Sequence, residues 1–176
     1  MRQKRGATPA GDSRVQREAE GCMVKKLSKK LGTTLKPFTL HLEHGGRLTV
    51  DGGSAQPPIL CEAWAHIGTP RPAQKAKVMM DAIKLAFAGQ RRPRPRLILA
   101  FADQAAAKPF QGKSWMAQAL ERFNIETHVV RLPKKLRAKV LKAQQLQAGR
   151  GHPRGRAVRR SRSRYSSRPR NIRIYH

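Results

Sequence analysis

The first regular hydrophobic pattern along the chain is helical. Apolar residues recur every three or four positions, at Val15, Ala19, Cys22, Met23, Leu27 and Leu31. This spacing places them on one face of an α-helix. We expect the helix to begin at residues 13–16, which have the S-x-x-Q form of a capping box, and to stop at Gly32.

Three short segments then alternate apolar and polar residues, as half-buried β-strands do. They lie at 38–42, 48–51 and 59–64. A Gly45-Gly46 turn separates the first two, and the Gly- and Pro-rich stretch 52–58 separates the last two. Connections this short favour antiparallel neighbours, so the three segments predict an antiparallel meander.

A second helix is predicted after the meander. It begins near Pro72, a residue favoured in the first helical turn, and ends at Gly89. The stripe that we expect to face the core consists of Ala76, Met79, Met80, Ile83 and Phe87. A polar stripe lies about 140° away on the same helix. Its members are Gln74, Lys77, Asp81 and Lys84.

The continuous apolar run 97–101 predicts a strand that is buried on both faces. A helix at 115–123, a strand at 127–132 and a helix opened by Pro133 follow it. The order is therefore α-β-β-β-α-β-α-β-α. This order predicts an α/β fold in which helices flank a mixed central sheet.

Composition divides the chain into three parts. Apolar residues are concentrated at 13–148, which we interpret as one α/β domain. Residues 1–12 and 149–176 have the composition of disordered basic segments, and the second holds ten arginines and no acid. GC-rich DNA read in a shifted frame yields a similar composition, so this tail alone does not identify a function.

Charge indicates a polyanionic partner. The chain has 38 Lys and Arg against 10 Asp and Glu, a formal net charge of +28, and it repels itself until a polyanion such as nucleic acid neutralises it. No run of about 18 apolar residues predicts a membrane span, and no apolar segment follows the basic N-terminus as in a secretory signal. Cys22 and Cys61 form no CxxC pair, so we expect reduced thiols in a cytoplasmic protein.

Two acids are expected to meet on neighbouring strands. Asp51 ends the second predicted strand, and Glu62 lies within the third. Such a carboxylate pair can hold Mg²⁺, which prefers oxygen ligands and can activate water next to a phosphate. Structural interpretations stay open for both, because Asp51 precedes two glycines and suits a turn, while Glu62 suits a buried ion pair.

The order of elements together with this acid pair resembles the PD-(D/E)XK nuclease superfamily, which has the restriction-endonuclease-like fold. The resemblance covers about residues 14–148, and the runs 60–68, 74–77 and 81–85 look like a group of uncharacterised actinobacterial and phage members. It implies a nuclease that hydrolyses phosphodiester bonds in DNA with Mg²⁺ or Mn²⁺. Relatives of this kind are often dimers, so a homodimer is also open.

The resemblance also implies roles for individual residues. Asp51, Glu62 and the backbone carbonyl of Ala63 would hold the metal, and Glu20 on the first helix would assist through water. The family's lysine, two residues after the glutamate, is replaced by Trp64. Some relatives carry this lysine on the following helix. We expect Lys77 to take its catalytic role here, because it lies on the same stripe as Gln74.

Residues expected to contact nucleic acid are Gln74, Lys84, Arg91, Arg92, Arg159 and Arg160. Three functions stay open. The first is the metal-dependent nuclease, and the second is a nuclease-like fold that binds nucleic acid without cutting it, which Trp64 favours. The third is a basic RNA- or ribosome-associated structural protein.

Three further residues have both a structural and a functional interpretation. Trp64 suits a core position or stacking on a base. His66 suits a loop position or a role as ligand or general base. Asp103 follows the buried strand, where α/β proteins bind ligands, but it also suits a helix N-cap.

Overall fold

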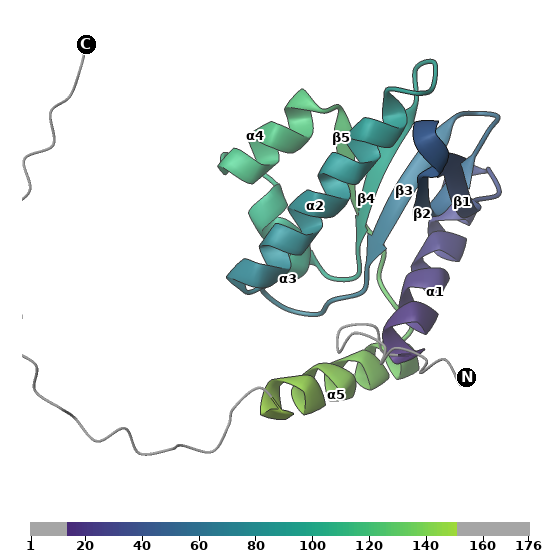
Figure 1. The fold of residues 1–176 in the computed structure, drawn as a ribbon. Helices are drawn as coiled ribbons and strands as arrows, with labels where there is room; N and C mark the ends of the chain where they lie inside the picture. The colour runs from purple at the N-terminus through teal and green to yellow at the C-terminus, as the bar shows by residue number, and fades with distance from the viewer. Residues whose placement is uncertain (1–13, 151–176) are drawn as a thin grey trace, which may run out of the picture.

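The computed structural model describes residues 14–150, which form a five-stranded sheet with helices on both faces (Figure 1). The expectations for residues 1–12 and for the chain after residue 150, which include Arg159 and Arg160, lie outside the described residues. The strands are β1 (Lys36–His41), β2 (Arg47–Ser54), β3 (Ile59–Trp64), β4 (Arg96–Phe101) and β5 (Ile125–Val129), and they lie in this order across the sheet.

The sheet is mixed, as the sequence predicts. β1, β2 and β3 are antiparallel neighbours, and β3, β4 and β5 are parallel. The antiparallel part is the predicted meander. The parallel part needs crossovers, which the helices between its strands provide. β4 occupies the interior of the sheet and is buried from Leu97 to Phe101, as its unbroken apolar run indicates.

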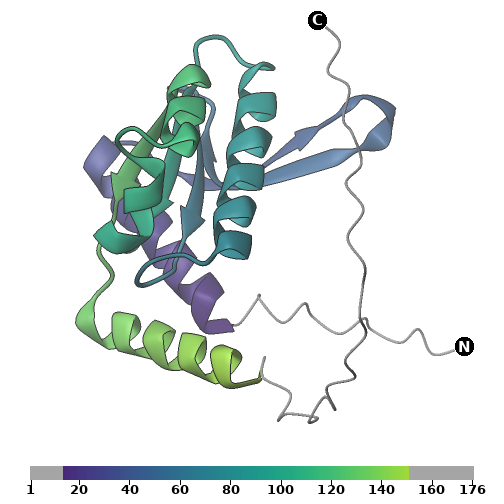
Figure 2. The same ribbon diagram turned by 90° about the vertical axis from the view of Figure 1, so that its left-hand side faces the viewer.

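Two layers of helices cover the sheet. The helices and 3-10 turns are α1 (Arg14–Leu31), η1 (Glu43–Gly45), α2 (Pro72–Gly89), α3 (Gln104–Ala107), η2 (Lys108–Phe110), α4 (Trp115–Arg122) and α5 (Lys134–Arg150). α2, α3 and α4 pack on one face, and α1 and α5 pack on the other (Figure 1). α5 runs across one end of the sheet (Figure 2).

The structure differs from the prediction between β4 and α5 in two ways: it contains two additional short helices, and one strand has different bounds. The sequence does not predict α3 and η2, because a four-residue helix carries no hydrophobic period. The predicted strand 127–132 instead spans Ile125–Val129. Its register on β4 explains this shift, since Leu97 pairs with Ile125 and Phe101, the last residue of β4, pairs with Val129.

α2 is rotated relative to its predicted orientation. Met80, Ile83 and Phe87 of the predicted core stripe are 63%, 50% and 40% exposed. The residues that face the core are Val78, Met79, Ala82, Leu85, Ala88 and Gly89. Because several of these are small, the helix backbone lies close to the sheet, and the polar stripe with Lys84 lies along the flank of the contact.

β2 contains a β-bulge at Asp51. Lys36 pairs with Gly53 but Phe38 pairs with Val50. An advance of two residues along β1 therefore corresponds to an advance of three residues along β2, which is the pattern of a β-bulge. Val50 belongs to the α2-side core, whereas a Cβ on Gly52 would meet Val24 of α1. In a regular strand these two positions share a face. Because of the extra residue, Val50 faces α2 while position 52 faces α1.

No helix within residues 14–150 is long and apolar enough to cross a membrane. Cys61 is buried, Cys22 is partly buried, and neither forms a disulfide.

Candidate functional site

Asp51 and Glu62 lie beside each other where β2 and β3 begin to separate. The last backbone pair between β2 and β3 at this end is Gly52 with Cys61. The two acids are the next residues on each strand, since Asp51 precedes Gly52 and Glu62 follows Cys61. There, Asp51 Oδ2 accepts a hydrogen bond of 2.9 Å from the backbone N–H of Ala63. The carboxylate thus takes the place of a backbone acceptor. Asp51 lies within a strand that continues to Ser54, so the interpretation of Asp51 as a turn residue is wrong.

Glu62 is the one buried charged side chain among the described residues, with 5% exposure. Its Oε1 atom contacts Lys84 Nζ and has no other hydrogen-bond partner within residues 14–150. Burial raises the pKa of Glu62, and the neighbouring Asp51 raises it further, while Lys84 opposes both effects. Glu62 is therefore in a buried ion pair, one of the two interpretations that the sequence leaves open.

Lys84, rather than Lys77, is the lysine that reaches the acid pair. Burial lowers the pKa of Lys84, but its contact with Glu62 outweighs this and raises the pKa overall. Lys77 is 61% exposed on its side chain, and its Nζ lies 3.4 Å from Asp81 Oδ2. The sequence contains the signal for Lys84, because it lies seven residues after Lys77 on the same polar stripe.

Glu20 of α1 forms the third part of the site. Gln16 Nε2 donates a 3.1 Å hydrogen bond to Glu20 Oε1. Burial raises the pKa of Glu20 to about 7; Asp51 adds to the rise, while Gln16 and Lys77 oppose it. Because Asp51 interacts with both other carboxyl groups, we call Glu20, Asp51 and Glu62 the acidic cluster. It unites one residue each from α1, β2 and β3.

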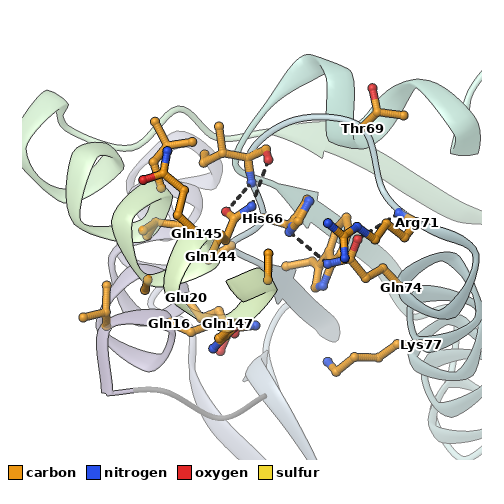
Figure 3. A pocket seen from close by; sticks show the side chains of 18 residues that line it. Gln16, Glu20, His66, Thr69, Arg71, Gln74, Lys77, Gln144, Gln145 and Gln147 are labelled. Carbon is orange, nitrogen blue, oxygen red and sulfur yellow. Dashed lines mark hydrogen bonds between the residues drawn. The ribbon is translucent and has the colours of Figure 1, made fainter. Parts of the chain in front are cut away.

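A pocket of about 710 Å³ adjoins the acidic cluster at Glu20. Its walls are the first turns of α1, the connection between β3 and α2, the first turns of α2, and α5 (Figure 3). We call it the α1–α5 pocket. Lys77 and Gln74 of α2 line its side opposite Gln16 and the amide-rich α5.

Paired side chains fix the wall between β3 and α2. Gln144 of α5 binds the backbone of Ile67 with both ends of its amide, at 3.0 and 3.1 Å. Gln74 Oε1 accepts from the backbone N–H of Arg71 at 2.8 Å, and its Nε2 lies 3.4 Å from His66 Nδ1. These contacts hold the loop 65–71 against both helices.

Trp64 and His66 form a stacked pair at this wall. Their ring centroids are 4.7 Å apart and the ring planes differ by 16°. Trp64 is only 5% exposed and meets Phe101 edge to face, so its core interpretation is confirmed. Burial lowers the pKa of His66, and Arg71 lowers it further. The lowered pKa favours the neutral imidazole, and one face of the ring lies on Trp64.

The remaining candidates lie elsewhere. Arg91 and Arg92 follow the far end of α2 from Gln74, and their guanidinium groups lie over Phe87 and Phe38 at 5.2 and 4.4 Å. Asp103 accepts from Ala105 N–H at 2.7 Å and thus caps α3, which confirms its N-cap interpretation.

Among the described residues, no group of three or more His, Cys, Asp or Glu side chains is arranged to hold a metal ion. Asp51 and Glu62 still offer a pair of adjacent oxygen donors of the kind that Mg²⁺ binds. Their mutual repulsion is the condition that a cation would relieve. The donor set fits a hard divalent ion with two protein carboxylates among its ligands.

Comparison with known proteins finds no relative. No protein-family model matches the chain, and no curated protein or solved structure matches it significantly.

Proposed function

We propose that this protein is a metal-dependent nuclease that hydrolyses phosphodiester bonds in DNA. The observation that carries the proposal is the convergence of Asp51, Glu62 and Lys84 at one point of the sheet. Two carboxylates and a lysine are the groups that the PD-(D/E)XK resemblance requires. The element order from α1 to β4 also agrees with the restriction-endonuclease-like core.

Asp51 and Glu62 would hold the Mg²⁺ or Mn²⁺ ion in this proposal. Once bound, the ion supplies charge stabilisation for the phosphate and lowers the pKa of a water molecule. Asp51 is oriented for this by the N–H of Ala63, which donates to its Oδ2 atom. The backbone carbonyl of Ala63 would be the third protein ligand, as the resemblance implies.

Lys84 would replace the lysine that Trp64 has displaced. Trp64 fills the core, whereas Lys84 arrives at Glu62 from the adjacent helix and keeps a partly exposed side chain. An ammonium group there balances phosphate charge and can donate a hydrogen bond to an attacking water. Glu20, on the other side of Asp51, would position that water through its own hydrogen bond.

The test is cleavage of linear, branched and single-stranded DNA by the purified full chain with Mg²⁺, Mn²⁺ or EDTA. Asp51→Asn and Glu62→Gln should each reduce metal-dependent cleavage by about a hundredfold or more, since each removes a ligand. Glu121→Gln, an exposed acid on α4, is the matched control and should cleave normally. Equal activity in all four proteins, or cleavage that persists in EDTA, would overturn the proposal.

A lysine series tests the proposed role of Lys84. Lys84→Met should lower cleavage by about tenfold or more, while Lys75→Met should change it little. Both residues lie on α2 and Lys75 does not line the α1–α5 pocket, so the pair controls for loss of positive charge on the helix.

Binding without cleavage is the second candidate function. It is favoured by the contact between Lys84 and Glu62, which already occupies the carboxyl group that a metal would use. If DNA binds equally well in EDTA, no condition yields cleavage, and the acid variants bind like the unaltered protein, this second function holds.

A further inference from the structure

The α1–α5 pocket lies next to the acidic cluster but contains neither Asp51 nor Glu62. Glu20 connects the two, because it lines the pocket and also interacts with Asp51. A strand whose phosphate lies at the acidic cluster would therefore place an adjoining nucleotide at the pocket. This relationship raises the question of which part of a nucleotide the pocket fits.

We propose that the α1–α5 pocket binds one unstacked nucleobase, so that the protein acts on single-stranded or locally opened nucleic acid rather than on intact duplex. The proposal rests on the proposed function for the position of the phosphate. The binding of the base itself does not depend on cleavage.

The pocket has room for a base together with its sugar. A volume of about 710 Å³ falls within the range of about 300–1,000 Å³ typical of sites for small organic ligands. A base paired and stacked within a duplex cannot enter a pocket of this kind. Proteins that take up a base in such a site act on single strands or extrude the nucleotide from the helix.

The wall at His66 offers a stacking surface. Trp64 covers one face of the imidazole, so the part of His66 that lines the pocket is its other face or its edge. The ring is fixed by Gln74 and by the stack on Trp64, so little conformational entropy is lost when a base contacts it. Unstacked bases are commonly held on aromatic side chains, including histidine.

The opposite wall offers hydrogen-bonding groups. Gln145 and Gln147 are exposed side chains of α5 that line the pocket. A glutamine amide both donates and accepts, which matches the alternating groups on base edges. Gln144 is already engaged with Ile67 and serves to hold the wall.

The rim of the pocket is positively charged. Arg71 and Lys77 both line it, and Glu20 is its one acidic residue among those described. Cations at the rim and apolar and amide groups inside match a nucleotide, whose phosphate is anionic and whose base is flat and neutral. A free nucleotide has the same chemistry, so the experiment must separate it from a strand.

The experiment measures binding of the full chain to a short single-stranded oligonucleotide in EDTA, where no cleavage occurs. The reference ligand is a fully abasic oligomer of equal length and charge, which keeps the electrostatic attraction at fixed salt. The unaltered protein should bind the base-containing strand about tenfold more tightly, as expected for one stacked base.

Ala143→Trp fills the pocket from α5, and Ala138→Trp places the same side chain on an exposed position of the same helix outside it. The first variant should lose the preference for the base-containing strand, and the second should keep it. If Ala143→Trp does not fold, the exposed pair Gln145→Ala and Gln147→Ala replaces it and should reduce the preference.

An equal affinity for both oligomers in the unaltered protein, or a preference that Ala143→Trp retains, would overturn the proposal. Tighter binding of free mononucleotides than of the strand would overturn it as well and would assign the pocket to a nucleotide ligand. Loss of cleavage in the earlier test would leave these binding results unaffected, so the two proposals fail independently.

Discussion

Lys84 of α2 contacts the buried carboxylate of Glu62 in β3, and this contact joins a helix to the interior of the sheet. Glu62 also interacts with Asp51 of β2. Because α2 is rotated relative to its predicted orientation, Lys84 lies at the edge of the helix's contact with the sheet, and its ammonium group reaches the carboxyl group of Glu62.

Removal of Lys84 should destabilise the fold more than removal of Lys77. Lys84→Met leaves Glu62 buried without its cation, and we expect a loss of about 1–3 kcal/mol in the free energy of unfolding. Lys77→Met breaks an exposed i,i+4 pair with Asp81 and should cost less than about 0.5 kcal/mol. Denaturant titrations of both variants measure the difference. Equal losses would mean that Lys84 does not neutralise Glu62.

Glu62 should make the protein less stable as the pH rises. Its pKa is raised in the fold, first by burial and then by Asp51, above the ordinary value of 4.5. Below 4.5 the carboxyl is protonated in both the folded and unfolded states, and above it the unfolded chain ionises first. Stability is therefore lost progressively as the pH rises from 4.5 through the raised pKa.

Glu62→Gln removes this effect. The melting temperature of the variant relative to that of the unaltered protein should increase steadily between pH 5 and pH 9, in the absence of divalent metal. Glu121→Gln, which alters an exposed acid, should show no such trend. A constant difference across the range would contradict the raised pKa.

Glu126 should have the opposite pH dependence. Arg96 donates two hydrogen bonds to its carboxylate, at 2.6 and 2.7 Å, and this contact lowers the pKa of Glu126 to about 2. Its contribution to stability is present above the unfolded value of 4.5 and is lost as the pH falls towards 2. Because both side chains are more than 40% exposed, Glu126→Gln should cost less than about 1 kcal/mol at pH 7.

The measurement is the melting temperature of Glu126→Gln and of the unaltered protein from pH 7 down to pH 2. The difference should shrink as the pH falls. A difference that grows in acid would mean that the pair with Arg96 does not hold the carboxylate ionised.

Two glycines should respond in opposite directions to alanine. A Cβ on Gly52 would lie 2.7 Å from Cys61 Sγ and 2.9 Å from Val24 Cγ1, so Gly52→Ala should destabilise by about 1–3 kcal/mol. Gly21 in α1 has nothing within 4 Å of that position, and Gly21→Ala should stabilise by about 0.5–1 kcal/mol through helix propensity. Denaturant titration distinguishes the two, and a tolerated Gly52→Ala would contradict the close packing of β2 on α1.

Alternation and apolar runs are sufficient to predict the architecture of the sheet. The meander of β1 to β3 follows from period-two patterns joined by short turns, and the interior position of β4 follows from its unbroken apolar run. Both signals are local in sequence. The end of β5 is not, because it is determined by where its partner β4 ends at Phe101.

The rotation of α2 could not be predicted from its own residues. The helix has apolar residues on most of its circumference, so more than one stripe could face the sheet. Packing selected the face with Ala82 and Ala88, and this choice exposed Met80 and brought Lys84 to Glu62. Lys77 was the natural choice from the sequence because it shares a stripe with Gln74, but it lies two turns too early.

The sequence predicts which two acids lie next to each other, but it does not predict how their side chains are oriented. The adjacency of Asp51 and Glu62 follows from the meander. The orientation of Asp51 towards both Glu62 and Glu20 depends on the β-bulge, which pairing with β1 reveals and the strand's own sequence does not.

The β-bulge also makes the acidic cluster sensitive to strand length. The register of β2 on β1 differs by one residue on the two sides of Asp51. Deleting Gly52 would remove this offset and restore regular alternation, so that the chain would keep the Asp51 carboxylate but change the direction in which it points. Substitutions that preserve the length of β2 are thus better tolerated than an in-frame loss of one codon.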